Sequence, residues 1–357
     1  MLNKSYFCDV KIHEKYINRC IELAQNGLGN TYPNPMVGSV IVHQGRIIGE
    51  GWHHKAGEPH AEVNAIASVK DKSLLKKSTI YVSLEPCSHY GKTPPCSDLI
   101  IAKEIKKVVI ATVDPFAEVS GRGIQKLLSA GCEVIVGVRE KEAQDLNKRF
   151  FTYHQKKRPY VILKWAQSED GFLAPEKKDK REPIWITNQY SKQLVHKWRS
   201  EEQAILVGTN TAVMDDPKLN SRLWEGKNPT RVLIDQNLRT PKDSAILDGS
   251  IKTIVICGMH SKPELDFNLL YFEKIDFLKE IASQIMNTLY EHHIQSVIIE
   301  GGSKTLQTFI DANLWDEARV FTGENQFLKG TSSPFLLGTK VLEQHLENDY
   351  LKIYKND

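Results

Sequence analysis

The sequence predicts two consecutive α/β domains, each with helices packed against a mostly parallel sheet. The first observation is length, because 357 residues exceed what one hydrophobic core usually supports. The second is an alternation of β-rich strands with helix-spaced apolar residues in both halves of the chain. The third is a charge-rich segment at residues 139–159, which is interpreted as a linker. We expect domains over residues 1–150 and 158–357.

Composition narrows the classes of function. Apolar residues make up 41% and charged residues 25% of the chain, as in ordinary globular proteins. The net charge is only +3, and Lys and Arg are not densely clustered in the sequence. Both observations argue against a nucleic-acid partner. The first twenty residues lack the apolar core of a secretory signal, and no apolar run approaches the ~20 residues of a membrane helix. We therefore expect a cytoplasmic protein without a membrane partner. Independently of these observations, we expect it to form a homo-oligomer.

The elements of the first half follow from hydrophobic spacing and turn residues. Apolar residues recur at helical spacing over residues 13–27, and Gly27 ends that pattern. Two β-rich runs, at 37–43 and 46–52, flank Gln44-Gly45 and predict a hairpin. Downstream we expect a helix from residue 59, a strand at 79–85, a helix from 96, a strand at 108–114, a short helix near 127 and a strand at 133–138.

The helix expected from Pro59 has polar residues at its start. Proline suits the first turn of a helix. Its inward face is predicted to be Val63, Ile66 and Ala67. His60 and Glu62 then stand at the helix N-terminus, where the partial positive charge favours an ionised Glu62.

One pattern carries specific chemistry: His60-Ala61-Glu62, followed by Pro86-Cys87 and then by Cys96. Catalytic zinc takes three protein ligands and keeps a fourth position for water, whose pKa it lowers toward neutrality. A carboxylate two residues from the imidazole can move a proton from that water to a leaving amine. The zinc-deaminase pattern is H-x-E with P-C-x-x-C, although the spacer before Cys96 is longer here.

Two other interpretations of these residues were weighed. A structural zinc site is usually closed by a fourth nitrogen or sulfur ligand, and no second cysteine pair stands at finger-like spacing. A disulfide between Cys87 and Cys96 suits an oxidising compartment. Six cysteines in 357 residues without framework spacing favour a reduced protein instead. The catalytic zinc site is preferred.

The segment around Asn34 has two interpretations. Pro33 and Pro35 restrict the backbone on either side of it. An amide held rigidly there can both donate to and accept from the edge of a heterocycle. A plain turn explains the same residues equally well.

The second half repeats the alternation of strands and helices. Strands are expected at residues 160–165, 204–207, 231–235, 253–257, 296–300 and 319–322, and helices at 189–200, 280–290 and 304–312. The strand at 296–300 runs into Gly301-Gly302 and a helix, whose first N–H groups can hold a phosphate. A tight turn is the alternative, and the absence of G-x-G-x-x-G leaves a Rossmann fold unsupported.

Four blocks of the first half are specific together. They are Pro33-Asn34-Pro35-Met36-Val37-Gly38, Ala56-Gly57-Glu58-Pro59-His60-Ala61-Glu62, Leu84-Glu85-Pro86-Cys87 through Cys96, and Asp114-Pro115 with Gly121-Arg122-Gly123. They resemble the pyrimidine deaminase domain of the bifunctional riboflavin-biosynthesis deaminase/reductase family (the RibD type). The resemblance includes the long cysteine spacer and implies a cytidine-deaminase-like α/β/α sandwich.

The resemblance also implies roles for single residues. Zinc would be held by His60, Cys87 and Cys96, with Glu62 as the catalytic proton shuttle. The substrate pocket would be lined by Asn34, His53, His89, Lys92 and Asp114. The Lys92 ammonium suits a phosphorylated substrate. The family usually has Asp-Pro-Asn where this chain has Asp114-Pro115-Phe116.

Residues 158–302 resemble the reductase domain of the same family, which is dihydrofolate-reductase-like and uses NADPH. The matching pieces include Trp185-Ile186-Thr187 and Glu300-Gly301-Gly302. By this resemblance the cofactor lies near Ala166, Ser168, Trp185, Thr211, Asp215 and Gly302. The ribose phosphate of the substrate would face Lys164, Thr187, Arg199, Leu219, Arg222 and Glu300. Arg199 and Arg222 are the residue type that forks a phosphate. The chain departs from the family at residues 181–183 and 321–325.

The resemblance implies a bifunctional enzyme of riboflavin synthesis. The first domain would hydrolytically deaminate 2,5-diamino-6-ribosylamino-4(3H)-pyrimidinone 5′-phosphate. The second would reduce the ribosyl group with NADPH, giving 5-amino-6-(5-phosphoribitylamino)uracil. Three alternatives are a nucleic-acid or nucleoside deaminase, a deaminase with an inactive reductase domain, and a zinc-dependent binding module. A nucleic-acid deaminase predicts a basic channel and a short Cys-x-x-Cys, and a binding module leaves Glu62 without a role.

Overall fold

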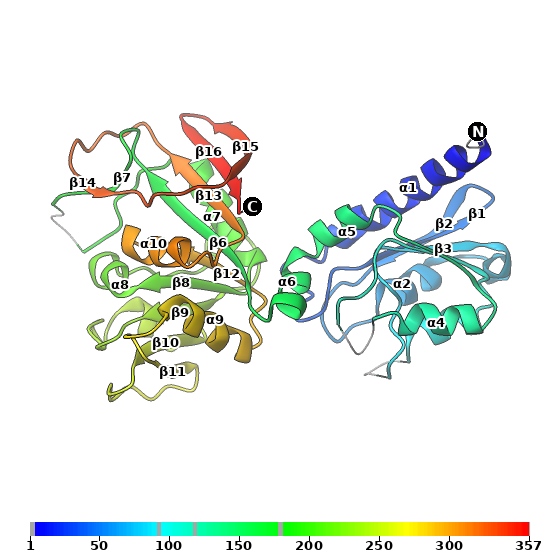
Figure 1. Ribbon diagram of the computed structural model, residues 1–357, viewed down its shortest axis with the longest axis horizontal. Helices are drawn as coiled ribbons and strands as arrows, with labels where there is room; N and C mark the ends of the chain where they lie inside the picture. The colour runs from blue at the N-terminus through cyan, green and yellow to red at the C-terminus, as the bar shows by residue number, and fades with distance from the viewer. Residues whose placement is uncertain (1–3, 91–93, 117–119, 178–180, 357) are drawn as a thin grey trace. The chain divides into compact units, whose positions relative to one another are not determined.

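A computed structural model of the chain describes residues 4–90, 94–116, 120–177 and 181–356. Its internal contacts divide the chain into two compact units, Met1–Lys156 and Lys157–Asp357, each of which has its own sheet (Figure 1). Among the described residues, no helix combines the length and the apolar character that crossing a bilayer requires.

The first unit is a three-layer α/β/α sandwich around a sheet of order β2–β1–β3–β4–β5. Its strands are β1 (Gly38–His43), β2 (Arg46–Trp52), β3 (Thr79–Val82), β4 (Lys107–Ile110) and β5 (Glu133–Val136). Its helices are α1 (Lys4–Gln25), α2 (Ala61–Ser68), α3 (Cys96–Ala102), α4 (Arg122–Ser129), α5 (Glu140–Leu146) and α6 (Lys148–Lys156), with a short 3₁₀ helix at Lys72–Lys77.

The pairing of this sheet is mixed rather than mostly parallel. Strands β3, β4 and β5 pair in parallel, whereas β1 is antiparallel to both β2 and β3. The expected hairpin is the cause, because a two-residue connection forces its strands to be antiparallel. Gln44 and Gly45 both have positive φ, 48° and 74°, as the turns that match strand twist require.

The two faces of the first sheet are covered by different helices. Helices α2, α3 and α4 pack on one face, and α1 and α5 pack on the other. The inward face of α2 differs from the predicted one, since Ala61, Glu62, Ala65 and Ile66 are buried. Val63 is half-buried and Ala67 is exposed. The face is rotated because Glu62 turns inward toward Cys96.

The segment predicted to be a linker is largely helical. Helices α5 and α6 occupy residues 140–146 and 148–156 of the charged stretch. Phe150 and Phe151 of α6 are buried and pack with Leu84 of the first unit. The charged residues of these helices are exposed or half-buried except for Arg149, which is buried. The boundary between units falls after Lys156.

The second unit is built on a sheet of order β11–β10–β9–β8–β12–β6–β13–β16–β15. Its strands are β6 (Tyr160–Gln167), β8 (Ala204–Gly208), β9 (Thr230–Ile234), β10 (Thr253–Gly258), β11 (Leu270–Ile275), β12 (Ser296–Glu300), β13 (Glu317–Thr322), β15 (Thr339–Leu346) and β16 (Asp349–Lys355). A separate ribbon pairs β7 (Phe172–Pro175) with β14 (Gly330–Ser332). Its helices are α7 (Gln189–Glu201), α8 (Thr209–Asp215), α9 (Ile281–Glu291) and α10 (Ser303–Asp311), with a 3₁₀ turn at Ala245–Leu247.

Pairing is parallel from β11 through β13 and antiparallel at β16 and β15. The sequence did not predict β7, α8, β11, β14, β15 or β16. Strand β15 shows the reason, because all of its residues but Leu346 are exposed. Without a buried face, a strand has no apolar alternation to detect.

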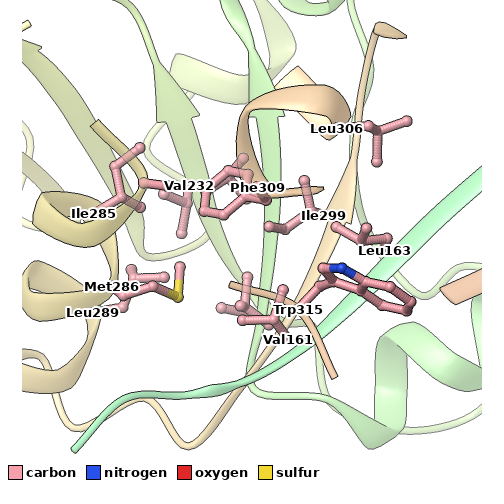
Figure 2. Packing of buried hydrophobic residues seen from close by; sticks show 14 of the residues in the cluster. Val161, Leu163, Val232, Ile285, Met286, Leu289, Ile299, Leu306, Phe309 and Trp315 are labelled. Carbon is pink, nitrogen blue, oxygen red and sulfur yellow. The ribbon is translucent and has the colours of Figure 1, made fainter. Parts of the chain in front are cut away.

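The main core of the second unit lies between its sheet and helices α9 and α10 (Figure 2). The labelled core side chains are Val161, Leu163, Val232, Ile285, Met286, Leu289, Ile299, Leu306, Phe309 and Trp315. On the opposite face, Val195 and Trp198 of α7 pack against the sheet. The second unit is therefore also a three-layer structure.

Phe309 is fully buried in this core, so truncation to alanine should destabilise the second unit. Removing a buried aromatic ring typically costs about 3–5 kcal/mol of unfolding free energy. Urea unfolding followed by tryptophan fluorescence reports mainly on this unit, because Trp52 is the only tryptophan before residue 157. Leu278→Ala, at a side chain 96% exposed, is the control. Equal midpoints for both variants would contradict the role given to Phe309.

Candidate active sites

Three side chains able to bind a transition metal converge in the first unit. His60 Nδ1 lies 3.6 Å from Cys87 Sγ and 3.3 Å from Cys96 Sγ. All three donor atoms lie within 4.8 Å of one another. A hydrogen bond from the Cys96 thiol lowers the pKa of Cys87, against the opposing effect of burial. One thiolate, the form that binds metals, is therefore favoured at neutral pH.

Local hydrogen bonds fix the positions of these donors. His60 is the N-cap of α2, Cys96 is the first residue of α3, and Cys87 lies in the loop after β3. The Cys96 backbone N–H donates to Cys87 Sγ at 3.3 Å. The N–H and the hydroxyl of Ser97 both donate to the Cys87 carbonyl, at 3.1 and 3.0 Å. The start of α3 thus holds the loop that carries Cys87.

Glu62 reaches the same point from the first turn of α2. Its side chain is 3% exposed, and among the described residues its Oε2 has no hydrogen-bond partner. Burial raises the pKa of Glu62 to about 7, although His60 opposes the rise. Desolvation therefore outweighs the helix N-terminal charge that was expected to keep this group ionised. An unpartnered carboxylate oxygen at this point is placed to exchange a proton with a ligand.

The donor set fits zinc. Tetrahedral zinc with bonds of about 2.0–2.3 Å brings its ligand atoms to roughly 3.5 Å from one another. The two measured separations, 3.6 and 3.3 Å, match that arrangement. Cys87 and Cys96 are free thiols, so the structure does not support the disulfide alternative. Three donors beside an unpartnered acid are typical of a catalytic site rather than a closed structural one.

Asn34 and His53, two predicted pocket residues, are held against each other near this cluster. Asn34 Nδ2 lies 3.0 Å from His53 Nε2, and His53 Nδ1 lies 3.2 Å from the Pro59 carbonyl oxygen. A carbonyl only accepts, so Nδ1 carries the proton and Nε2 accepts from the Asn34 amide. Burial lowers the pKa of His53, which favours this neutral form. The rings of His53 and His60 meet edge to face, with centroids 5.3 Å apart.

Asp114 follows β4 and is buried. Its Oδ1 accepts from the Phe116 N–H at 2.8 Å. Burial raises the pKa of Asp114 to about 6, and the charge of exposed His89 opposes this rise. The Phe116 ring packs on His154, with centroids 5.1 Å apart. Lys92, the remaining predicted pocket residue, lies outside the described residues.

Glu85 organises this site, although the sequence analysis gave it no role. Its buried carboxylate accepts from the backbone N–H groups of Asp114, Gly121, Gly123 and Ile124, at 3.3, 2.9, 2.9 and 3.3 Å. It therefore caps the N-terminus of α4 and fixes the loop that carries Asp114. The sequence did contain an indication of this role, because Glu85 is an acidic residue that follows a buried strand and directly precedes Pro86-Cys87.

Asn147 is a second positioning residue that the sequence analysis missed. It lies between α5 and α6 and is buried. Its Oδ1 accepts from the Met36 N–H, and its Nδ2 donates to the Met36 carbonyl, both at 2.8 Å. These two hydrogen bonds to the backbone of Met36 fix the loop that carries Asn34.

The second unit contains a cavity of about 1350 Å³ at the carboxyl ends of its parallel strands. A single drug-sized ligand fills roughly 300–1,000 Å³, so the cavity has room for a cofactor and a substrate. The predicted reductase residues that line it are Lys164, Ala166, Trp185, Thr187, Arg199, Thr211, Asp215, Leu219, Arg222, Glu300 and Gly302. Ser168 is not among the lining residues. It is fully buried and its hydroxyl donates to Asp170 at 2.6 Å, so it shapes the turn before β7.

A buried ion-pair network lies in this cavity. Arg199 Nη2 lies 2.8 Å and Lys164 Nζ 3.8 Å from Glu300 Oε2. Glu300 and Lys164 are paired neighbours on the parallel strands β12 and β6. Burial alone would raise the pKa of Glu300, but Arg199 and Lys164 outweigh it and lower that pKa to about 2. The cavity therefore contains an ionised carboxylate at neutral pH.

The junction of β12 and α10 forms another part of the wall. Gly302 is the N-cap of α10, and its N–H donates to Thr211 Oγ1 at 3.1 Å. A Cβ on Gly302 would meet nothing closer than that oxygen, at 4.0 Å. The space beside this backbone is open, as an approaching phosphate requires.

Comparison with known proteins identifies the family. Residues 10–112 match the cytidine and deoxycytidylate deaminase zinc-binding region, and residues 159–325 match the RibD C-terminal domain. The chain is 40% identical over 350 residues to riboflavin biosynthesis protein RibD of Aquifex aeolicus, covering 94% of each sequence. This chain belongs to the RibD family. It is also 37% identical to RibD of Escherichia coli K12, covering 86% of each sequence.

The solved structures agree with the RibD assignment. A Thermotoga maritima crystal structure is described as a diaminohydroxyphosphoribosylaminopyrimidine deaminase/5-amino-6-(5-phosphoribosylamino)uracil reductase. It matches with a TM-score of 0.86 at 37% identity, covering 97% of this chain and 99% of that one. The chain is thus a bifunctional enzyme of riboflavin biosynthesis, with a zinc-binding, cytidine-deaminase-like domain and an NADPH-using, dihydrofolate-reductase-like domain. This confirms the predicted family, fold classes, activities and cofactors.

Both departures from the RibD pattern are held to neighbouring elements by hydrogen bonds. Arg181 Nε donates to the Val213 carbonyl at 2.8 Å, and its Nη2 donates to Ser244 Oγ at 2.7 Å. It therefore ties the segment before Trp185 to the end of α8. In the other departure, the Gly323 N–H donates to the Gln167 carbonyl at 3.0 Å, which continues the pairing with β6.

Glu85→Gln should destabilise the first unit, because the amide would present N–H groups to backbone donors. Each buried group left unpaired costs about 1–3 kcal/mol. Thermal unfolding followed by circular dichroism would measure this, and metal analysis should show zinc retained. Glu104→Gln removes an exposed acid paired with Lys76 at 2.9 Å and is the control. A melting temperature equal to that of the control would show that Glu85 does not hold these loops.

Proposed function

We propose that the two units act in succession on one phosphorylated diaminopyrimidine. The deaminase, assigned to residues 1–150, removes an amino group from 2,5-diamino-6-ribosylamino-4(3H)-pyrimidinone 5′-phosphate. The reductase, assigned to residues 158–357, converts the ribosyl group of the product to ribityl with NADPH. The observation that carries this proposal is the His60–Cys87–Cys96 cluster with the unpartnered Glu62 oxygen. The activities in the name of the Thermotoga maritima protein support the substrate assignment.

In the deaminase, His60, Cys87 and Cys96 would hold zinc, which supplies a nucleophile from water at neutral pH. Glu62 Oε2 would accept one proton from the attacking water and give it to the neighbouring ring nitrogen. It would then carry the remaining hydroxyl proton to the amine as the C–N bond breaks, which leaves a carbonyl on the ring and releases ammonia. The Asn34–His53 pair orients the pyrimidine, because it leaves the Asn34 carbonyl oxygen to accept from the ring edge. His89, Lys92 and Asp114 complete the proposed substrate pocket.

In the reductase, the two ligands occupy different parts of the cavity. Ala166, Trp185, Thr211, Asp215 and Gly302 would hold the nicotinamide cofactor, and Ser168 would support it through the turn before β7. Lys164, Thr187, Arg199, Leu219, Arg222 and Glu300 would hold the substrate. Reduction would add hydride to C1 of the ribosyl group as the bond from C1 to the ring oxygen breaks, and that oxygen would take up a proton. Lys164 can deliver this proton, and Glu300, which stays ionised, can orient the sugar hydroxyls.

We also propose a cytoplasmic homo-oligomer that does not bind nucleic acid. Free thiols at Cys20, Cys132 and Cys257 suit a reducing compartment. The exposed apolar side chains of Phe335 and Leu337 offer a contact surface to a second copy. Light scattering after size-exclusion chromatography measures the oligomeric state.

The substrate assignment is tested by incubating the purified protein with the diaminopyrimidinone phosphate. Ammonia should appear without NADPH, and NADPH oxidation should follow only after deamination has begun. A protein that releases ammonia but never oxidises NADPH would be a deaminase with an inactive reductase domain. Cytidine deamination at a comparable rate would favour the nucleoside alternative.

Cys96→Ser should remove zinc and deaminase activity together, because a hydroxyl is a poor zinc ligand beside a thiolate. Elemental analysis should show one zinc ion per chain in the wild type and a large loss in the variant. Cys132→Ser changes a buried thiol outside the cluster and should retain the metal. Full zinc in Cys96→Ser would exclude this thiol from the site.

Glu62→Gln should separate the two activities. The amide keeps the size of the side chain but cannot shuttle a proton, and general acid–base catalysis typically contributes ~10²–10⁴-fold. Deamination should fall by about that factor with zinc retained. Oxidation of NADPH with substrate that has already been deaminated should stay near wild type. An equal loss in both assays would mean that the two sites are coupled, and intact deamination would exclude Glu62 as the shuttle.

A further inference from the structure

We propose that Arg181 is a positioning residue for the cofactor, because it holds one end of the cavity-lining segment 183–187 against the end of α8. The proposal rests on the function given above, which places the cofactor beside Trp185 and Asp215. Arg181 is not among the described residues that line the cavity, so it acts through this segment rather than on a ligand.

Residues 183–187 form part of the cavity wall between β7 and α7 in the chain. All five of them line the cavity, and so do residues 213–217 at the end of α8 and just beyond it. The structure shows neither helix nor strand over 183–187. A segment without a regular ladder of backbone hydrogen bonds depends on the contacts at its two ends for its position.

The end of the segment nearer α7 is fixed against the main sheet. The Ile186 carbonyl oxygen would lie only 2.2 Å from a Cβ on Gly323, so this approach to the end of β13 requires a glycine. Asn188 directly follows the segment. Its N–H donates to Asp349 Oδ2 at 2.9 Å, and its Nδ2 donates to the Leu346 carbonyl at 2.6 Å. This end therefore does not depend on Arg181.

The other end of the segment is held through the guanidinium of Arg181. Its Nε donates to the Val213 carbonyl at 2.8 Å, in the last turn of α8, where carbonyls lack helical partners and attract a cation. Its Nη2 donates to Ser244 Oγ at 2.7 Å. The Asp216 carboxylate lies 3.5 Å from the same Nη2 and also accepts from the Ala245 N–H at 2.9 Å. One side chain thus joins the segment to α8 and to the 3₁₀ turn.

The elements that Arg181 joins are two walls of the part of the cavity assigned to the cofactor. Trp185 is on one wall, and Thr211 and Asp215 of α8 are on the other. The Trp185 side chain is 53% exposed, so burial does not fix it and its position follows that of the backbone. Without Arg181 the segment samples other positions. The apparent affinity for the cofactor then falls in proportion to the fraction of molecules with both walls in place.

The substrate part of the cavity is held independently of this anchor. Lys164 and Arg199 both pair with Glu300, at 3.8 and 2.8 Å, on elements outside the segment. Thr187 is in the segment, but it directly precedes Asn188 at the end fixed to the sheet. Loss of the other end should therefore weaken binding of the cofactor more than binding of the substrate.

Arg181→Met in the full-length, zinc-loaded enzyme tests the proposal, because methionine keeps the aliphatic part of the side chain and removes its donors. Calorimetric titration with NADPH, without substrate, should show about three- to tenfold weaker binding, as the loss of one or two hydrogen bonds predicts. At saturating NADPH, kcat and the KM for the deaminated substrate should stay within about twofold of the wild type. Arg181→Lys should recover part of the affinity, since an ammonium can reach one of the acceptors.

Hydrogen exchange in the cofactor-free enzyme measures the anchor directly, wherever the cofactor binds. The amides of residues 184–187 should exchange faster in Arg181→Met than in the wild type. Lys352→Met is the matched control. Lys352 also pairs with a carboxylate of the second unit, that of Glu343 at 3.6 Å, and it is not among the described residues that line the cavity. This variant should match the wild type in exchange and in NADPH affinity.

Unchanged exchange or unchanged NADPH affinity in Arg181→Met would overturn the proposal. Trp185→Ala separates this failure from a wrong cofactor position. If Trp185→Ala weakens NADPH binding and Arg181→Met does not, the cofactor position stands and the role given to Arg181 is wrong. If neither variant changes the affinity, segment 183–187 does not serve the cofactor, which overturns both assignments.

Discussion

Parallel pairing between neighbouring strands is the constraint on which both sites depend. Neighbouring parallel strands end at the same edge of their sheet, so the residues that follow them lie close together. In the first unit, β3 and β4 pair in parallel and lead to Cys87 and Asp114. In the second, β6 and β12 place Lys164 beside Glu300 in direct register. The positions of the site residues in each unit therefore depend on the backbone hydrogen bonds between these strands.

The two sites treat a buried glutamate in opposite ways. Glu62 is desolvated without a cation tightly bound to it, so its pKa rises to about 7. Glu300 is also largely buried, but Arg199 and Lys164 hold its pKa near 2. The first arrangement suits a group that must take up and release a proton near neutral pH. The second suits a group that must stay charged and fixed, as recognition of sugar hydroxyls requires.

Most of what the sequence could predict came from residues whose chemistry is local. Two features were predictable: the hairpin at Gln44-Gly45 and the convergence of His60, Cys87 and Cys96. Turn residues and metal-ligand patterns can both be recognised within short stretches of sequence. Glu85 and Asn147 were not, because each binds backbone groups far along the chain. Strand β15 was missed because its exposed residues show no alternation. Residues 140–156 were interpreted as part of a linker because charged residues are frequent in these helices and most of them are exposed or half-buried.

The two hydrogen bonds between Asn147 and Met36 connect the C-terminal helices of the first unit to the loop that carries Asn34. The last two helices of that unit do not simply lead to the reductase. Asn147, between these helices, holds the loop that carries Asn34 through the Met36 backbone. Phe150 and Phe151 of α6 pack against Leu84. A gene fission that cut the chain at residue 150 would leave the deaminase only three of the nine residues of α6 and would remove Phe151 from the support of Leu84. A cut after Lys156 would keep that support. A separate deaminase therefore needs a chain that extends to the end of α6.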